Sequence, residues 1–339
     1  MALSKVNPNF VNVSQYGRRN LIINGAMQVA QRGTSRSFGG TYNTLDRWAM
    51  GQYQQAGHEQ VSVTDTSVPV KKAIKVTSSS TSEAGSGTRM ALAQIVESQN
   101  CDFLAGKTVT LSFYIRFSDA TMTGGGDFLF QLNEYDSVDP NLLTTGATRE
   151  NNTTIAQGSL PTSWTKYTKT ITCSSTMKNL GARFLFSNLF NTTANSDEWY
   201  EVTGVQLEAG DTATPFEHRS YGEELALCQR YFWNQVHQSS DAMVMDGFWG
   251  SATIFEGTVR YPVPMRAAPS LSTTSIGNIA ALNPQTAWYA ASSVVIDFSS
   301  GVYASKLTFQ VANSGLAKGV GGVLALRGAG ASVSFTAEL

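Results

Sequence analysis

The sequence is poor in charge. Only 14% of its 339 residues are Asp, Glu, Lys or Arg, against about 25% in ordinary globular chains. The formal net charge of -1 provides no basic field for nucleic acid or for an anionic membrane surface. Hydrophobic residues still make up 42%, which is ample for packed cores. Low charge combined with many Ser, Thr, Asn and Gly residues favours β-structure and large buried interfaces.

Long apolar runs and an export signal are also missing. No stretch of about 20 apolar residues occurs that could cross a bilayer, and the first residues lack the basic, apolar and small-residue order of a secretory signal. Three cysteines are an odd number, and they lack zinc-like spacing. They predict buried, reduced thiols and synthesis in a reducing cytoplasm.

The sequence motifs of common enzymes are absent. The three histidines are scattered, and no HExxH, GxSxG or GxxxxGK[ST] pattern occurs, so we expect neither an enzyme nor a cofactor. The densest acidic group is NEYDSVDP, which contains Glu134, Asp136 and Asp139. Such a loop is more often a solvated turn than a catalytic carboxylate pair. Its oxygen donors leave a weakly held structural calcium ion as an alternative.

Short segments of alternating polarity are abundant. In VTLSFYIRF, residues 109–117, apolar side chains fall on one face, and Thr110, Ser112, Tyr114 and Arg116 fall on the other. This period of two predicts a strand with one face on a core. Similar segments alternate with corners rich in Gly, Asn and Pro, which is typical of an antiparallel sandwich or jelly roll. The predicted fold class is all-β.

One helix interrupts the predicted strands. SYGEELALCQRYF begins with Ser220, a favourable N-cap residue, and has Glu223 three positions later, which is the spacing of a capping box. The helix separates the predicted regions, which are an N-terminal arm (1–19), a jelly-roll β-sandwich (20–219), the connecting helix (220–232) and a second, smaller β-sandwich (233–339).

The region after the helix is especially poor in charge. It holds ten charged residues, five acidic and five basic, so its formal charge is zero. A small β-domain of this composition precipitates easily when it is wholly exposed. We therefore expect it to be buried in part against copies of itself. A monomer whose surface is polar through Ser and Thr is the alternative.

Aromatic residues are numerous for a weakly charged β-protein. Six tryptophans and twelve tyrosines occur. Flat rings edged by Asn, Gln and Asp can hold sugars in a β-sandwich, although a tryptophan there more often fills the core. The residues that we predict as glycan-binding candidates are Trp48, Trp164, Trp249 and Trp288.

Several motifs resemble those of bacteriophage tail-fibre and fibre-like virion proteins. These proteins carry a jelly roll like that of carbohydrate-binding modules, followed by a small β-domain. The motifs are NLIINGAMQVAQRGTS, YNTLDRWAM, LAGKTVTLSFYIRFS, LPTSWTKYTKTIT, EVTGVQLEAGDTATPFEHRSYGEELALCQRYF, GTVRYPVPMRAAPSL and SVSFTAEL. The resemblance touches both predicted domains and leaves out the arm and the variable loops.

This resemblance implies a virion protein that is assembled in the host cytoplasm. It further implies a homotrimer that attaches to host surface glycans and is anchored to other phage tail or virion proteins through its arm, with Asn7, Pro8, Asn9 and Phe10 as candidate anchoring residues. In the first motif, the Asn24–Gly25 pair predicts a corner directly after a first strand at residues 21–23, because both residue types tolerate positive φ.

Two other functions remain open at this stage. One is a purely structural virion component, such as a head fibre, a collar or a baseplate decoration. The other is a tailspike enzyme that depolymerises polysaccharide, which would require a close carboxylate pair in an aromatic groove. No short repeat typical of a parallel β-helix occurs in the sequence, so we rank this enzyme below the fibre.

Overall fold

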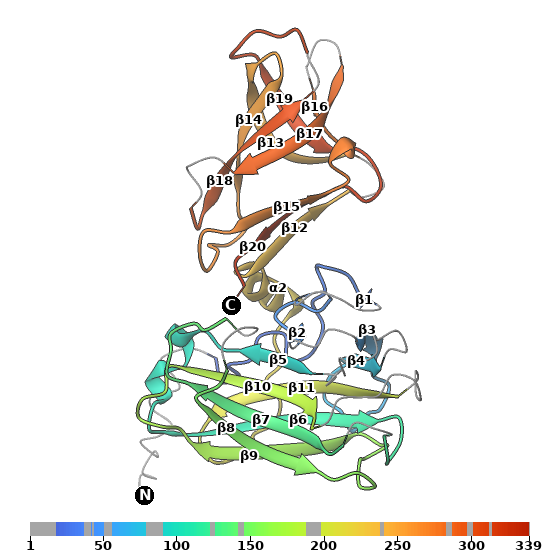
Figure 1. Cartoon of the computed structure of the whole chain (residues 1–339), viewed down its shortest axis with the longest axis vertical. Coiled ribbons are helices and arrows are strands. Elements are labelled where there is room, and N and C mark those ends of the chain that lie inside the picture. Colours follow the sequence, from blue (N-terminus) through green and yellow to red (C-terminus); the bar gives the residue numbers. More distant parts are fainter. Residues whose placement is uncertain are drawn as a thin grey trace, which may run out of the picture. The chain divides into compact units, whose positions relative to one another are not determined.

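The fold is built almost entirely from antiparallel strands, as a computed structural model shows (Figure 1). The structure describes residues 18–36, 42, 44–50, 56–78, 91–122, 126–141, 146–187, 198–237, 241–282, 287–296, 301–311 and 314–338. Every strand pair among these residues is antiparallel. The predicted all-β class is confirmed. The chain divides into two compact units, with the boundary between Glu224 and Leu225.

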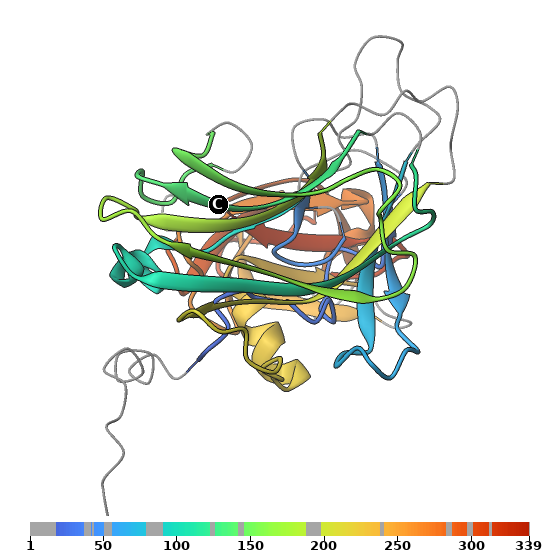
Figure 2. The same cartoon turned by 90° about the horizontal axis from the view of Figure 1, so that it is seen from below.

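The N-terminal unit contains two sheets, of six and five strands (the long teal to yellow strands in Figure 2). The six-stranded sheet has the order β1 (Ser35–Arg36), β3 (Ala56–Ser62), β4 (Lys72–Ser78), β11 (Trp199–Ala209), β6 (Thr108–Phe117) and β9 (Thr165–Thr172). The five-stranded sheet has the order β2 (Ala49–Met50), β5 (Leu92–Ile95), β10 (Asn179–Phe186), β7 (Phe128–Tyr135) and β8 (Arg149–Ile155). Two short 3-10 helices, η2 (Ser98–Asn100) and η3 (Asp102–Leu104), precede β6.

Aromatic side chains from both sheets fill the core of this unit. Phe113 of β6 meets Phe130 of β7 and Phe184 of β10, with ring centroids 4.9 and 4.8 Å apart in edge-to-face geometry. The inward positions predicted for β6 are fully buried. On its other face, Tyr114 and Arg116 are half-buried, but Thr110 and Ser112 are buried as well. The predicted inward face of β6 is therefore confirmed, and other parts of the protein cover part of the outer face of the sheet.

The first signature motif forms an irregular turn and not the predicted strand. Residues 20–27 meet β11 at two points, where the amide of Leu21 donates to the carbonyl of Leu207 and the amide of Val205 donates to the carbonyl of Gly25. A Cβ atom at Gly25 would lie 2.1 Å from the carbonyl oxygen of Val205, so only glycine fits. Asn24 has a φ of 57°, which fits the predicted corner.

The single α-helix of the described residues, α2 (Tyr221–Gln229), begins with the predicted capping box. The hydroxyl and the amide of Ser220 both donate to Glu223 at 2.9 Å. The amide of Glu223 donates back to the Ser220 hydroxyl at 3.3 Å. Donors at the start of the helix are thereby satisfied.

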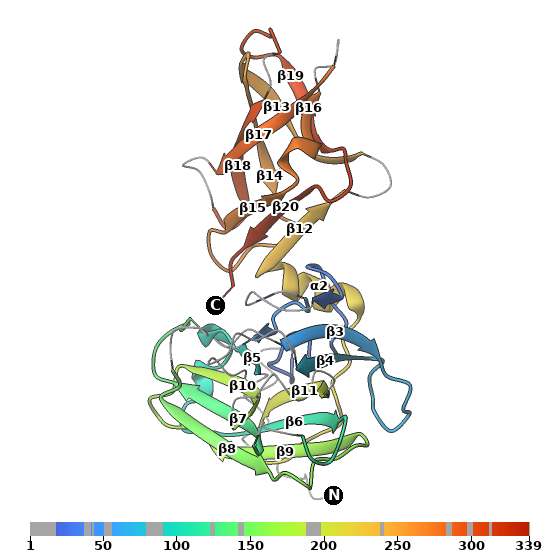
Figure 3. The ribbon, with the colours of Figure 1, turned by 45° about the vertical axis from the view of Figure 1, so that its right-hand side comes forward.

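The C-terminal unit contains a closed six-stranded barrel and a three-stranded sheet where a second sandwich was expected (Figure 3). The barrel order is β13 (Ala242–Ser251), β14 (Ile254–Arg260), β18 (Ala304–Val311), β17 (Trp288–Ile296), β16 (Ile279–Leu282) and β19 (Gly321–Leu326). The small sheet has the order β12 (Phe232–Val236), β20 (Ser332–Thr336) and β15 (Ser270–Thr274), and the 3-10 helix η4 (Ile276–Asn278) follows β15.

Closure of the barrel brings its strands close together around large rings. Trp249 and Phe255 are fully buried in it, with ring centroids 5.6 Å apart. Gly322 faces both rings, and a Cβ atom there would lie 3.1 Å from Phe255 and 2.5 Å from the carbonyl oxygen of Leu282. Alternating polarity predicts strands for a sandwich and a barrel alike, so the pattern did not distinguish them.

Candidate functional site

The four candidate tryptophans separate into two pairs. Trp48 and Trp249 are 1% and 0% exposed, so they fill the two cores, and the prediction that they bind glycan is wrong for the folded chain. The indole nitrogen of Trp48 donates to the carbonyl of Asn24 at 3.0 Å. Trp164 and Trp288 are half-buried, and each lines a surface hollow of about 300 Å³.

The hollow at Trp164, called here the sandwich hollow, lies over the outer face of the six-stranded sheet. Its lining comes from three segments: the end of β3 and the turn after it, one position of β6, and the corner before β9. The lining residues are Ser62, Val63, Thr64, Asp65, Arg116, Thr162, Ser163 and Trp164. Hydroxyl groups, one carboxylate, one guanidinium and one indole therefore share a small space.

Arg116 is the central cation of this hollow. Its guanidinium carbon lies 5.1 Å from the ring centroid of Trp164 and 5.4 Å from that of Trp199. Its Nε donates to Glu201 at 2.7 Å. Lys75 lies 5.0 Å from the centroid of the Trp199 ring. Each cation is thus held against an aromatic face.

The strand register explains this arrangement. Glu201 of β11 is directly opposite Arg116 of β6 on one side and Lys75 of β4 on the other. Side chains directly opposite each other in an antiparallel pair lie within reach of one another. Trp199 lies two residues before Glu201 and thus on the same face of β11. Trp199 was not among the predicted residues, because the alternation in WYEVTGVQLEA does not reveal which strands lie beside it.

One edge of the sandwich hollow is fixed by an apolar cluster. Val63, Val68 and Val70 of the β3–β4 turn are buried, and Tyr114 and Trp164 pack against their cluster. Trp164 thus packs against apolar side chains and also lines the hollow. A ring fixed in this way loses little side-chain entropy when it contacts a ligand.

The charges around the hollow are unequally exposed. The side chain of Glu201 is only 5% exposed, whereas that of Arg116 is 34% exposed, so the cation of this ion pair dominates the surface. Asp65 is fixed by Ser67, whose hydroxyl and amide both donate to it. The Ser67 hydroxyl bond, then the amide bond, and to a smaller extent the charge of Arg116 lower the pKa of Asp65. The carboxylate is therefore an ionised acceptor.

The acidic residues that were considered as calcium ligands bond to other groups of the protein. Glu134 and Asp136 both pair with Arg149, and the hydrogen bond from Arg149 is the main cause of the lowered pKa of Asp136. Asp139 accepts from the amide of Ser98 at 2.7 Å and from the side chain of Asn179 at 3.1 Å. Within the described part of the chain, no group of three or more His, Cys, Asp or Glu residues could hold a metal ion.

The candidate anchoring residues, Asn7, Pro8, Asn9 and Phe10, lie outside the described residues. The end of the predicted arm does belong to the N-terminal unit. The backbone amide of Arg19 donates to Glu217 at 2.9 Å, and its guanidinium lies 3.6 Å from Glu208. The boundary of any free arm therefore lies before Arg19.

The three cysteines were predicted to be buried and reduced. Cys101, Cys173 and Cys228 are all buried, and none of the three forms a disulfide, as predicted. Burial raises the pKa of Cys101 and of Cys173 to about 12, so these thiols stay protonated at neutral pH.

No helix in the described ranges has the length and apolar character needed to span a membrane.

Comparison with known proteins gives matches among solved structures. No protein-family model matches the sequence, and no curated protein matches it. The chain is similar to the enzymatically active domain of tailspike protein 4 of bacteriophage CBA120 (TM-score 0.36, 11% identity), covering 56% of this chain and 21% of that one. It is also similar to a family 16 carbohydrate-binding module (TM-score 0.32, 13% identity, 56% and 99% covered). A putative sugar binding protein from Bacteroides thetaiotaomicron is similar too (TM-score 0.33, 16% identity, 57% and 100% covered). The chain thus spans about a fifth of the tailspike chain, and the likeness concerns the fold.

Proposed function

We propose that this protein is a non-enzymatic bacteriophage virion protein, a tail fibre or similar appendage, that binds host surface glycan in the sandwich hollow. The observation that carries the glycan part is the fixed Trp164 ring beside Arg116, bordered by hydroxyl groups and the Asp65 carboxylate. The virion part rests on the sequence motifs. The hollow measures about 300 Å³, at the small end of the range of roughly 300–1,000 Å³ for ligand pockets, which suits a short glycan segment.

The chemistry of the lining matches the two kinds of surface on a sugar. The C–H groups of a pyranose can contact the part of the Trp164 indole that lines the hollow, since an aromatic ring is a flat apolar surface. Sugar hydroxyls can accept from Arg116, donate to Asp65 and exchange hydrogen bonds with Thr64 and Ser163, all of which line the hollow. Since Asp65 is ionised, it accepts from hydroxyl donors.

The residues that line the sandwich hollow suit glycan binding better than glycoside hydrolysis. A glycosidase generally uses paired carboxyl groups on either side of the scissile bond, separated by about 5 to 9.5 Å. Asp65 is the one carboxylate among the residues that line the sandwich hollow. Arg116 holds Glu201, the nearby second carboxylate, in an ion pair on the sheet.

Several copies on one particle would compensate for a weak individual site. Linked sites raise the apparent affinity by orders of magnitude when they engage the same surface. The low charge of the C-terminal unit and its exposed apolar side chains support self-association, and the resemblance to phage fibres makes a homotrimer the expected form. The arm before Arg19 would then dock onto another virion protein.

The test compares variants of the full chain on a glycan array. The Trp164→Ala variant should lose at least about tenfold in affinity for one or more of the glycans that the wild-type chain binds, because truncation of an aromatic hot-spot residue costs about 2 kcal/mol or more. Tyr221→Ala is the matched control, since Tyr221 is 56% exposed and does not line the sandwich hollow. It should bind as the wild type does.

Two results would overturn the proposal. A wild-type chain that binds no glycan would favour a purely structural virion component. Release of reducing sugar from host polysaccharide by the purified chain would favour the depolymerising enzyme.

A further inference from the structure

A second hollow lies on the barrel of the C-terminal unit, around Trp288 at the start of β17. The guanidinium carbon of Arg327, directly after β19, is 4.4 Å from the ring centroid of Trp288. The hollow, called here the barrel hollow, also measures about 300 Å³. Its lining residues are Gly277, Asn278, Ala280, Trp288, Ala290 and Arg327. Figure 3 shows the strands β16 and β17, which carry three of the six, and β19, which ends directly before Arg327.

Small side chains beside Trp288 create the space. Ala280 of β16 and Ala290 of β17 are directly opposite each other, and Ala290 is on the same face of its strand as Trp288. At Gly277, a Cβ atom would find nothing within 4 Å. The indole of Trp288 is therefore the one large apolar group among the lining residues. Beside it lie the methyl groups of Ala280 and Ala290 and the backbone of Gly277.

The polar groups of the barrel hollow are held in place and still have bonding capacity. Asp241 accepts from the Nε of Arg327 at 3.0 Å. The guanidinium is planar and stacks on the Trp288 ring, and its terminal N–H groups can donate to a ligand. The side-chain nitrogen of Asn278 donates to the carbonyl of Ala329 at 3.2 Å, which orients its side-chain oxygen as an acceptor. The backbone amide of Arg327 donates to the carbonyl of Asn278 at 2.8 Å.

The charge of this hollow is balanced. The side chains of Arg327 and Asp241 are 39% and 36% exposed, so both signs reach the surface almost equally. A site of this kind gives no net attraction to an anion or a cation, and it offers both donors and acceptors to hydroxyl groups.

We propose that the barrel hollow is a second sugar-binding site, specific for a neutral pyranose. The ring would rest its C–H groups on Trp288 and the neighbouring alanines, while its hydroxyls would bond to Arg327 and Asn278, which line the hollow. Asp241 accepts from Arg327 and holds its guanidinium in place. The proposal extends glycan binding to the C-terminal unit. It does not require the sandwich hollow, because every group that it uses belongs to the C-terminal unit.

The experiment uses full-length chains in which the sandwich hollow is disabled by Trp164→Ala, on an array of neutral and acidic glycans. We expect this variant to keep binding to neutral glycans, and the additional Trp288→Ala change to weaken that binding by about tenfold or more. Arg327→Lys, made in the same background, keeps the charge opposite Asp241 but removes the planar donors, so it should also weaken binding.

Tyr303→Ala is the matched control, since Tyr303 is 70% exposed and lies outside the lining of the barrel hollow. Far-ultraviolet circular dichroism and melting curves establish that each variant is folded.

The outcomes separate this inference from the proposed function. If Trp164→Ala alone abolishes all glycan binding, the sandwich hollow stands and the barrel site is refuted. The same follows if residual binding is indifferent to Trp288→Ala, or if only acidic glycans are retained. If Trp164→Ala changes nothing and Trp288→Ala removes neutral-glycan binding, the barrel site stands and the sandwich hollow is refuted. A wild-type chain that binds no glycan refutes both.

Discussion

At the scale of single residues, the surroundings decide what a given side chain does. Four tryptophans that look equivalent in the sequence become two core residues and two residues that line hollows. Each of the latter has an arginine within about 5 Å of its ring centroid and small or hydroxyl-bearing neighbours. Ring chemistry alone therefore indicated candidates, and burial separated them.

His58 of β3 makes a further prediction at this scale. It is 3% exposed, and its Nε2 has no hydrogen-bond partner in the described part of the chain. Burial lowers its pKa from 6.5 to about 3. Between these values the unfolded chain binds a proton that the folded chain does not, so stability should fall as the pH drops below 6.5. The slope from this one group is at most about 1.4 kcal/mol per pH unit.

Chemical denaturation of the wild type and of His58→Phe at several pH values between 7 and 4 measures this contribution. The free energy of unfolding of the variant should decline less steeply, because it lacks the buried imidazole. Carboxyl groups contribute equally to both curves, so the difference isolates His58. Parallel curves would show that the pKa of His58 is the same in the folded and the unfolded chain and would contradict the prediction.

At the scale of elements, the first signature motif is a polar anchor for neighbouring segments. The side-chain nitrogen of Asn24 donates to the carbonyls of Val29 and Asp46 at 2.8 and 3.0 Å, and its oxygen accepts from the amide of Val29 at 3.0 Å. The backbone amide of Asn24 donates to Glu224 of α2 at 2.5 Å. One buried residue thus ties the turn at its own position to the segment before β2 and to the start of the helix.

The Asn24→Ala variant should therefore be strongly destabilised. Alanine tolerates the positive φ poorly, and its methyl group leaves the three hydrogen-bonding groups around it without their partner. We expect a loss of about 3 kcal/mol or more in the free energy of unfolding. Asn152→Ala on the exposed face of β8 is the control, with an expected change within about 0.5 kcal/mol. Urea titration of both variants measures these values, and equal stabilities would contradict the anchoring role.

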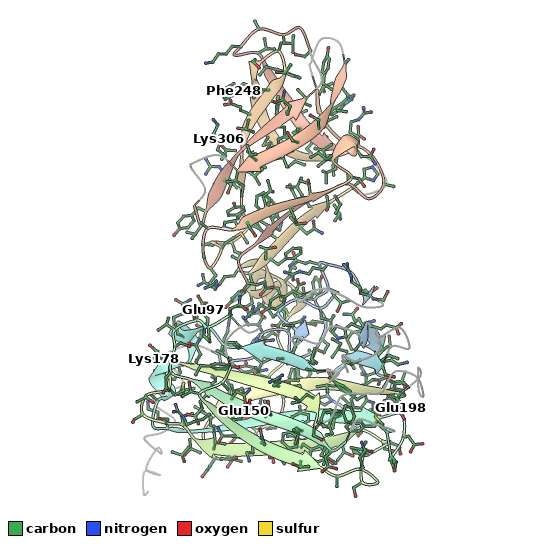
Figure 4. The ribbon with its side chains drawn as sticks, in the orientation of Figure 1. Glu97, Glu150, Lys178, Glu198, Phe248 and Lys306 are labelled. Carbon is green, nitrogen blue, oxygen red and sulfur yellow. The ribbon has the colours of Figure 1, made fainter. Side chains whose placement is uncertain are left out.

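At the scale of the whole molecule, the C-terminal unit exposes several large apolar side chains. Met243 and Phe248 of β13 are 58% and 41% exposed. Figure 4 shows Phe248 and Lys306 on the outside of the barrel, and Lys306 pairs with Glu256 at 3.0 Å. These exposed apolar residues motivate a test of the proposed self-association.

We expect the full chain to be a trimer at micromolar concentration, and Met243→Asp combined with Phe248→Asp to shift it toward the monomer. The reason is that two carboxylates would have to lose their hydration at the contact. Light scattering after size-exclusion chromatography measures the mass of each form. Thr258→Asp, at an exposed site on β14, is the control for added charge. A wild-type chain that stays monomeric would contradict self-association.

Sequence reasoning succeeded where the signal is local. The alternation in 109–117 placed the inward side chains of β6, and the spacing of Ser220 and Glu223 placed the capping box. It failed where a distant segment covers a face. Gln206 and Glu208 are polar and alternate with apolar residues in β11, yet both are buried, because Thr214 and the amide of Glu217 bond to them. Nothing in a strand pattern reveals such a cover.

By itself, the sequence determined the strand class, the helix start, the buried thiols and the low charge, because each depends on periodicity, capping or composition within a short window. The tertiary structure alone decided which tryptophans face solvent, that Trp199 and Lys75 join Arg116, and that the C-terminal strands close into a barrel. Those features depend on strand order and register across long separations in the chain. Many such pairings are compatible with one alternating pattern, and the packing of the whole core selects among them.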